Sequence, residues 1–152
     1  MYGVLDLTVP QLPRDAPKHL LGIGEPDDLV EGIARGIDLF DCAVPTRLAR
    51  HGTALAPLPD ARHRFDVRRS ALALDQDPLV EGCPCPACER HTRAYLHYLS
   101  REEELTGVRL LTVHNLTYLE QLVRGAREAI AGRRFGAYRE AILAGAPPWA
   151  AG

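Results

Sequence analysis

The N-terminal third of the chain holds two short apolar runs joined by a stretch with helical periodicity. The first run, HLLGIG (19–24), is closed by glycines, and the second, IDLFDCAV, occupies 37–44. Between them, Pro26 and the two aspartates that follow it suit a first helical turn, and Gly36 is a typical helix stop. The apolar face of this helix would consist of Leu29, Val30, Ile33 and Ala34. Two apolar runs joined by a helix predict a βαβ unit with parallel strands.

The rest of the chain divides by composition into further zones. We expect 1–44 to end in the βαβ unit, 45–82 to be rich in loops, 83–132 to be mainly helical and 133–152 to be a flexible, frayed tail. Within the helical zone, apolar spacing predicts one helix across residues 94–105 and a second beginning near Asn115, a residue type favoured at helix N-termini.

Length and composition match one soluble globular domain. The chain has 152 residues, of which 46% are hydrophobic and 25% charged. We expect a cytoplasmic protein without a membrane partner, because no apolar run approaches about 18 residues and the first residues do not resemble a signal peptide. The net charge is −2, yet 43–69 holds six arginines against two acids. This basic interval is either a solvated loop or a phosphate-binding surface.

Three cysteines fall within six residues in CPCPAC, at Cys83, Cys85 and Cys88. Zinc prefers four sulfur or nitrogen donors in a tetrahedron, so three thiolates need one further ligand. Disulfides or free thiols are the alternative, but three crowded cysteines cannot all pair, and disulfides are rare in the cytoplasm. The spacing leaves the fourth ligand open among the histidines His91, His97 and His114. With four protein ligands, the site would be structural.

Asp41 lies where the second apolar run ends. The carboxyl ends of parallel strands usually carry the chemistry of α/β proteins, and an arginine-bearing loop follows directly. Asp41 is therefore a candidate for contact with a phosphate-containing substrate, or else a capping or ion-paired residue. Asp38 is a second candidate at the start of the same run, and Cys42 is expected to pack as a small apolar residue.

The motifs, taken together, resemble one enzyme family. The string HLLGIGEPDDLVEGIARGIDLFDCAVPTRLARHG contains FDC-x-x-PTR-x-x-R, and CPCPAC, TRAYLHYL and LLTVHNLTYLEQLVRGAREAI follow it in order. Over roughly residues 5–131 the chain resembles the C-terminal portion of bacterial tRNA-guanine transglycosylases, also called queuine tRNA-ribosyltransferases. The resemblance implies an α/β fold: the last two strands of a TIM (β/α)8 barrel, a zinc-binding subdomain and C-terminal helices.

The resemblance also implies an activity and its residues. The family exchanges guanine 34, the wobble base of tRNAs with a GUN anticodon, for a 7-deazaguanine base such as preQ1. Asp41 would be the nucleophile that forms a covalent ester with the ribose, as carboxylates do in retaining glycosidases. One structural Zn²⁺ would be held by Cys83, Cys85, Cys88 and His114. One RNA-binding segment would be Thr46, Arg47, Leu48, Ala49 and Arg50. The other would be Gly22, Ile23, Gly24, Glu25, Pro26, Asp27 and Asp28.

The chain departs from the family in two ways. It is less than half the family's length and lacks the segment that carries the second catalytic aspartate. Leu21, which with Gly22 would form the edge of the base pocket, stands where the family commonly has methionine. We therefore expect this chain alone to be inactive and to associate or aggregate, because its strand edges are uncovered. The resemblance also implies a homodimer for the full-length protein, because bacterial members of the family form homodimers whose interface lies near the zinc region. The alternatives are a zinc-stabilised RNA-binding or dimerisation remnant and part of a DNA-directed relative.

Overall fold

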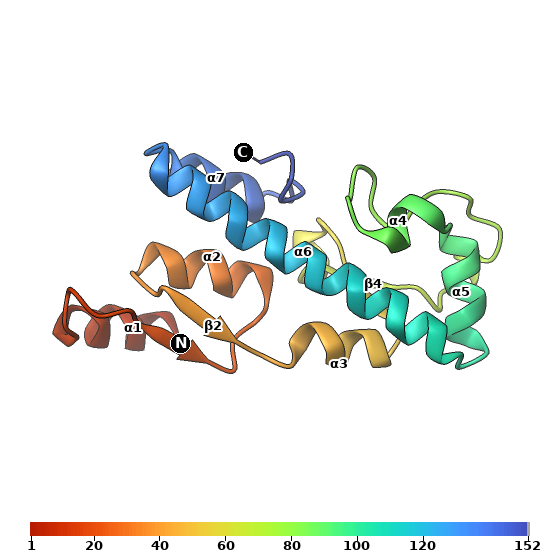
Figure 1. Cartoon of the computed structure of the whole chain (residues 1–152), viewed down its shortest axis with the longest axis horizontal. Helices are drawn as coiled ribbons and strands as arrows, with labels where there is room; N and C mark the ends of the chain where they lie inside the picture. Colours follow the sequence, from red (N-terminus) through yellow and green to blue (C-terminus); the bar gives the residue numbers. More distant parts are fainter. Residues whose placement is uncertain (152) are drawn as a thin grey trace.

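One long helix, α6 (Leu105–Ala131), organises the molecule. The computed structural model describes residues 1–151, and in it the 27-residue α6 runs between two groups of elements (Figure 1). The first strand pair and α7 (Phe135–Leu143) lie toward its C-terminal end, whereas α4 (Pro86–Arg90) and α5 (Arg93–Arg101) lie toward its N-terminal end. None of the helices formed by residues 1–151 has the length and apolarity that a bilayer crossing requires.

The βαβ unit predicted from the apolar runs is present. Strand β1 (His19–Leu21) pairs in parallel with β2 (Leu39–Asp41), in a register that places Leu21 opposite Asp41. Helix α2 (Pro26–Ala34) connects them and begins with proline at its first turn, as expected. Its apolar face is buried against α6 and α7. The sheet has two strands in the described part of the chain, so its origin in a barrel stays a prediction.

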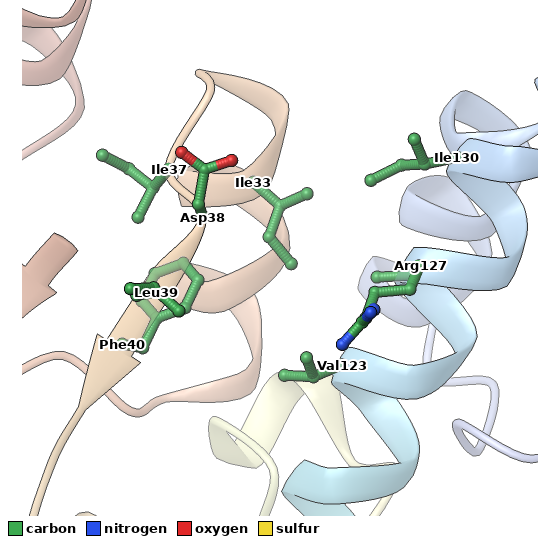
Figure 2. A pocket seen from close by; sticks show the side chains of 9 residues that line it. Ile33, Ile37, Asp38, Leu39, Phe40, Val123, Arg127 and Ile130 are labelled. Carbon is green, nitrogen blue, oxygen red and sulfur yellow. The ribbon is translucent and has the colours of Figure 1, made fainter. Parts of the chain in front are cut away.

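The side of β2 that faces α6 is only partly covered. A groove of about 460 Å³ separates the α2–β2 side of the molecule from α6, and Figure 2 shows Ile33 and Phe40 facing Val123 and Ile130 across it. Leu39, at the start of β2, is 51% exposed. Parallel strands are normally covered on both faces, so this pair is unusually exposed to solvent.

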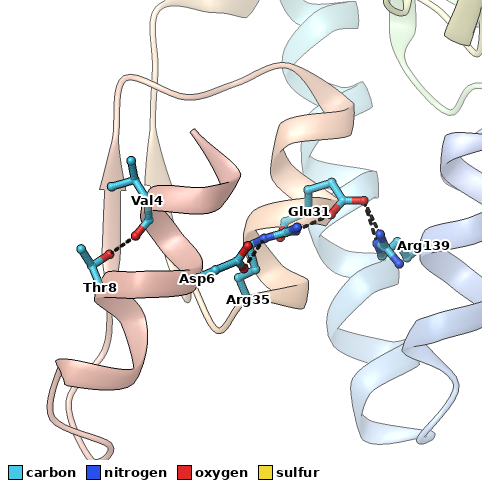
Figure 3. Close-up of polar contacts among 6 residues, drawn as sticks. All are labelled: Val4, Asp6, Thr8, Glu31, Arg35 and Arg139. Atoms are coloured by element: carbon cyan, nitrogen blue, oxygen red, sulfur yellow. Dashed lines mark hydrogen bonds and ion pairs between the residues drawn. The ribbon is translucent and has the colours of Figure 1, made fainter.

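An ionic network joins the N-terminal helix α1 (Tyr2–Thr8) to α2 and α7 (Figure 3). Its centre is the buried carboxylate of Glu31 in α2, which accepts hydrogen bonds from Arg35 and from Arg139 of α7. Arg35 also donates to Asp6 of α1, with 2.9 Å between Nε and Oδ1. The short 3-10 turn η1 (Val9–Gln11) follows α1 and precedes β1.

The interval expected to be loop-rich contains more regular structure than the sequence indicated. It includes helix α3 (Val44–Arg50) and an antiparallel hairpin of β3 (Thr53–Leu55) and β4 (Arg64–Asp66). The remaining turns are η2 (Pro59–Ala61) and η3 (Ser70–Leu72). The hairpin escaped prediction because each of its strands has three residues, too few for a readable alternation.

Two helix predictions in the C-terminal half need correction. Asn115 does not cap a helix: α6 begins ten residues earlier, at Leu105, and Asn115 is fully buried in its interior. The frayed tail expected over 133–152 instead contains helix α7, whose Tyr138 and Ile142 are buried. The Tyr138 hydroxyl donates to the Leu122 carbonyl oxygen of α6 at 2.8 Å, so tertiary contacts order a terminal segment that was expected to be frayed.

The described residues form two hydrophobic cores along α6. The first surrounds the cysteines and consists of Ala49, Ala54, Ala56, Val67, Leu79, Val80, Cys83, Cys85, Ala87, Cys88, Leu96 and Leu111. The second lies where α2, α6 and α7 meet and consists of Leu29, Val30, Leu122, Ala126, Ala129, Tyr138 and Ile142. The cysteine-rich core and the βαβ core therefore share one long helix as their common wall.

Candidate functional site

The three cysteines of CPCPAC converge on one imidazole. The Nδ1 atom of His114 lies 3.7 Å from Sγ of Cys83, 3.4 Å from Sγ of Cys85 and 3.3 Å from Sγ of Cys88. Cys85 caps the N-terminus of α4, Cys88 lies within that helix, and His114 projects from the middle of α6. All four side chains are buried, and their donor atoms lie within 4.8 Å of one another.

These separations can be compared with those of a metal tetrahedron. Bond lengths of about 2.3 Å to sulfur and about 2.0 Å to nitrogen place sulfur and nitrogen ligands roughly 3.6 Å apart around zinc. The observed 3.3–3.7 Å brackets that value. Three soft thiols and one imidazole also form a donor set that favours zinc over magnesium or calcium, because those two ions prefer oxygen ligands. The cluster is therefore compatible with a closed four-ligand metal site.

The imidazole is oriented for such a site by the hairpin. The Nε2 atom of His114 lies 2.8 Å from the carbonyl oxygen of Leu55 in β3. Because a carbonyl only accepts hydrogen bonds, Nε2 carries a proton, and Nδ1 is the nitrogen that faces the sulfurs. A second contact of this kind commonly fixes a metal-binding histidine.

The charges of the cluster also favour a bound cation. Burial alone would lower the pKa of His114, but the thiols of Cys85 and Cys88 outweigh it and raise the pKa to about 10. Hydrogen bonds from Cys83 and Cys88 hold the pKa of Cys85 far below its usual range. A negative potential that favours a proton on a buried imidazole equally favours a divalent cation at the same place.

The other histidines considered as ligands are occupied elsewhere. The ring of His91 stacks on Tyr95 with 5.0 Å between centroids, and Nδ1 of His97 donates to the Val67 carbonyl oxygen at 2.9 Å. Neither belongs to the cluster. The structure thus selects His114 from the candidates that the spacing left open. It does so from the interior of a helix, not from the turn entering a helix that the sequence indicated.

Asn115, the residue after the imidazole, was missed as a site residue. Its Oδ1 accepts from the Leu55 amide at 2.7 Å, and its Nδ2 donates to the carbonyl oxygens of Pro45 at 3.0 Å and Thr53 at 3.1 Å. His114 and Asn115 together therefore hold both polar backbone groups of Leu55. The one available signal was a polar residue among the regularly spaced apolar residues of a helix. From the sequence alone, that residue is interpreted as a helix cap.

Asp41 lies at the carboxyl end of β2, as expected, with 64% of its side chain exposed. Its Oδ1 is 3.6 Å from Nε2 of His19 and accepts from the Gly22 amide at 3.3 Å. These contacts orient the carboxylate without burying it. Asp38, the second candidate, is already engaged, because its Oδ2 accepts from the Lys18 amide at 2.8 Å.

The loop between β1 and α2 packs tightly against the residue after Asp41. A β-carbon on Gly24 would stand 2.0 Å from Sγ of Cys42, so this position accepts only glycine without rearrangement. Cys42 is half-buried in this contact, which matches the packing role expected for it. Leu21 and Gly22, the expected edge of a base pocket, are exposed beside Asp41.

The arginines of Thr46–Arg50 face solvent on α3. Ala49 is buried, whereas Arg47 and Arg50 are exposed and form no ion pair within residues 1–151. Residues three apart share a helix face, so the two guanidinium groups present positive charge on one side of α3. That helix begins three residues after Asp41.

Comparison with known proteins gives these residues a context. The family model described as queuine tRNA-ribosyltransferase matches residues 1–148. The chain belongs to the queuine tRNA-ribosyltransferase family. A family member named queuine tRNA-ribosyltransferase from Roseiflexus sp. is 49% identical over 139 residues, which cover 91% of this chain and 35% of the relative.

Two further relatives with that name give the same picture. The protein from Symbiobacterium thermophilum is 46% identical over 94% of this chain and 35% of its own length, and that from Desulforudis audaxviator is 47% identical over 95% and 38%. The chain therefore spans little more than a third of these queuine tRNA-ribosyltransferases and corresponds to their C-terminal portion.

Proposed function

We propose that this chain carries the nucleophile, two RNA-binding segments and the structural metal of a tRNA-guanine transglycosylase. The reaction would exchange guanine 34 of a GUN anticodon for preQ1 or queuine. The observation that carries the proposal is the exposed carboxylate of Asp41 at the strand end, in a chain that matches this family over residues 1–148.

In the proposed reaction, a carboxylate oxygen of Asp41 attacks C1′ of the ribose while the bond from C1′ to N9 of guanine breaks. Guanine leaves with a proton from a general acid, and the RNA stays bound as a glycosyl ester. The incoming 7-deazaguanine base then attacks C1′, loses a proton and releases the carboxylate. A carboxylate suits both steps, since it stabilises an oxocarbenium-like centre and is also a competent leaving group.

Arg47 and Arg50 would bind phosphates near the wobble nucleotide, because unpaired guanidinium groups form paired hydrogen bonds to phosphate oxygens. The rest of Thr46–Arg50 and the segment Gly22–Asp28 would surround the same nucleotide. Leu21 and Gly22 would form the pocket edge for the base.

We propose zinc as the metal of the cysteine cluster. Three thiols and one imidazole at tetrahedral separations favour it, and zinc would act there by bracing α4, α6 and β3. Cys83, Cys85, Cys88 and His114 would fill its coordination sphere, leaving no position for a substrate. The proposal places the protein in the cytoplasm, as a part of a homodimeric enzyme.

The second candidate is a remnant without turnover that binds RNA or a second copy, or a part of a DNA-directed relative. The observation that favours the remnant lies around Asp41, whose carboxylate has His19 and the Gly22 amide as its polar partners within residues 1–151. Neither supplies the second carboxylate that would protonate guanine. We therefore propose that the chain alone does not turn over.

The test mixes the purified chain, together with a protein that supplies the N-terminal part of a family member, with unmodified tRNA that has guanine 34, with and without preQ1, and examines denaturing gels for a covalent adduct. Asp41→Asn should abolish the adduct, whereas Asp38→Asn, three residues away, should retain it. An adduct that survives Asp41→Asn would show that the nucleophile is another residue. Reversible tRNA binding without any adduct in the wild type would support the remnant.

A further inference from the structure

The segment Gly22–Asp28 contains three acidic residues, and each carboxylate turns toward the protein. Glu25 forms an ion pair with Arg64 of β4. Oδ1 of Asp27 lies 2.6 Å from Nε2 of His63, and Oδ1 of Asp28 accepts from the Tyr2 hydroxyl at 2.7 Å. The segment is thus attached to α1 and to the turn that leads into β4.

The contacts of Glu25 and Asp27 are more than exposed surface pairs. His63 is fully buried and the Glu25 side chain is only 16% exposed, although the Asp27 and Arg64 side chains are 37% and 42% exposed. Water cannot easily replace the partner of a buried imidazole, so the contact between His63 and Asp27 holds its geometry better than an exposed ion pair.

The turn before β4 is shaped to aim His63 at Asp27. Arg62 and His63 both adopt left-handed backbone conformations, with φ of 53° and 57°, which residues with side chains rarely adopt. The conformation of His63 is held from both sides: the Ala56 amide donates to its carbonyl oxygen at 2.9 Å, and its own amide donates to the Leu58 carbonyl oxygen at 2.8 Å.

We propose that Glu25 and Asp27 are positioning residues that fasten Gly22–Asp28 to the β3–β4 hairpin through Arg64 and His63. The segment then meets RNA with the exposed Gly22 and half-buried Ile23, and not with its carboxylates. This inference rests on the proposed function for the RNA, but the fastening itself does not. It divides the seven-residue segment into a part that faces the substrate and a part that anchors it.

The position of the anchored loop matters for Asp41. The Gly22 amide donates to the Asp41 carbonyl oxygen at 2.8 Å, so the start of the segment is hydrogen-bonded to the residue proposed as nucleophile. Gly22 has a φ of +75°, which glycine alone adopts freely. A loop that loses its anchor at Glu25 and Asp27 would loosen this contact.

The sign of a mutational effect separates anchoring from direct contact. A carboxylate that merely faces RNA repels phosphates, so its removal should tighten RNA binding. A carboxylate that anchors the loop should, when removed, weaken binding because the loop must be ordered again on association. Asp60 is a matched control: it is an exposed acid in the turn of the same hairpin, and its side chain forms no hydrogen bond or ion pair within residues 1–151.

The experiment compares Glu25→Ala, Asp27→Ala and Asp60→Ala in the full chain with its metal. Amide hydrogen exchange without RNA should become faster across residues 22–29 in the first two variants and stay unchanged in Asp60→Ala. The affinity for an anticodon stem-loop with guanine 34 should fall about tenfold, or about 1.4 kcal/mol, in the first two and stay equal or rise in Asp60→Ala.

His63→Asn approaches the same contact from the other side, because asparagine tolerates the left-handed backbone but is too short to replace the ring. It should also accelerate exchange at 22–29. Unchanged exchange in all three anchor variants would overturn the fastening. Tighter RNA binding by Glu25→Ala and Asp27→Ala would overturn the assignment of their carboxylates as anchors. If the wild type binds no stem-loop while exchange responds as expected, the proposed function fails and the fastening stands.

Discussion

Around the cysteine cluster all four donor atoms are buried, and the hairpin, α4 and α6 surround them. At the other end of the molecule, the side chain of Asp41 is 64% exposed, and its neighbours Leu21 and Leu39 are 67% and 51% exposed. The cluster contains every ligand that a tetrahedral metal requires. The strand pair offers one carboxylate and two open strand edges.

The difference shows that the half around the cysteine cluster fixes its own geometry, whereas the half around the strand pair does so only in part. A buried site with a full donor set and an oriented imidazole is specified by contacts within this chain. Parallel sheets are normally buried on both faces, but this two-stranded sheet has exposed leucines and few elements that cover it. The geometry of the strand-pair half therefore depends on its anchors, namely the network of Glu31 and the contacts of the Gly22–Asp28 loop.

Metal removal should have the largest effect and should break the buried half. Zinc contributes about 10–16 kcal/mol to small zinc-dependent peptides, which equals or exceeds the whole stability of a typical domain at about 5–15 kcal/mol. We expect one equivalent of zinc, and we expect chelation or Cys85→Ser to abolish cooperative unfolding followed by circular dichroism. Cys42→Ser, outside the cluster, should keep both the metal and the transition. A chelated protein that melts like the untreated one would refute the structural role.

Loss of Asn115 should come next. Asn115→Ala leaves the Leu55 amide and the carbonyl oxygens of Pro45 and Thr53 without their partner, at a cost of about 2–4 kcal/mol. Urea unfolding measures this cost, and zinc content should fall little because the four ligands remain. The control is Leu116→Ala, the next residue of α6, whose side chain is 49% exposed. Equal losses in both variants would assign no special role to the amide.

Acid should weaken the strand-pair half first. Burial alone would raise the pKa of Glu31, but the hydrogen bonds and charges of Arg35 and Arg139 outweigh it and hold the pKa below its usual range. Because the folded-state value lies below the unfolded one, this stabilisation is complete above about pH 4.3 and is lost as pH falls through the folded value.

Glu31→Gln should cost about 1–2 kcal/mol at neutral pH and should flatten the decline in unfolding free energy between about pH 5 and pH 3. Exposed Glu120 provides the comparison, since Glu120→Gln should leave both the stability and the acid limb unchanged. An acid limb that is equally steep in Glu31→Gln would mean that other carboxylates determine it.

Asp41→Asn should have the smallest effect on stability, within about 0.5 kcal/mol, because its side chain is mostly exposed. Asp38→Asn should cost more, since the Lys18 amide donates to the Asp38 carboxylate. Thermal melts of the two variants measure this difference. A large loss of stability in Asp41→Asn would indicate a structural carboxylate and would weaken its assignment as a nucleophile.

Local patterns were sufficient for the βαβ unit and for three of the candidate metal ligands. Parallel strands and their connecting helix follow from two apolar runs, a proline at the first turn and a glycine stop, all within 26 residues. The thiols of CPCPAC are brought together by the chain itself. The fourth ligand is 26 residues beyond Cys88, where spacing could not choose among histidines and only the family resemblance pointed to His114.

The sequence by itself determined which chemical groups are present: three clustered thiols, a carboxylate ending a strand and arginines on the following segment. Tertiary structure decided where the polar groups of each segment turn. It placed Asn115 inside α6 to hold Leu55 and Pro45, turned Glu25 and Asp27 toward the hairpin, and ordered α7 through Tyr138. These outcomes depend on partners between 16 and 70 residues away. A local sequence pattern indicates which backbone conformation a segment prefers. Contacts between residues so far apart in the sequence form only once the chain has packed.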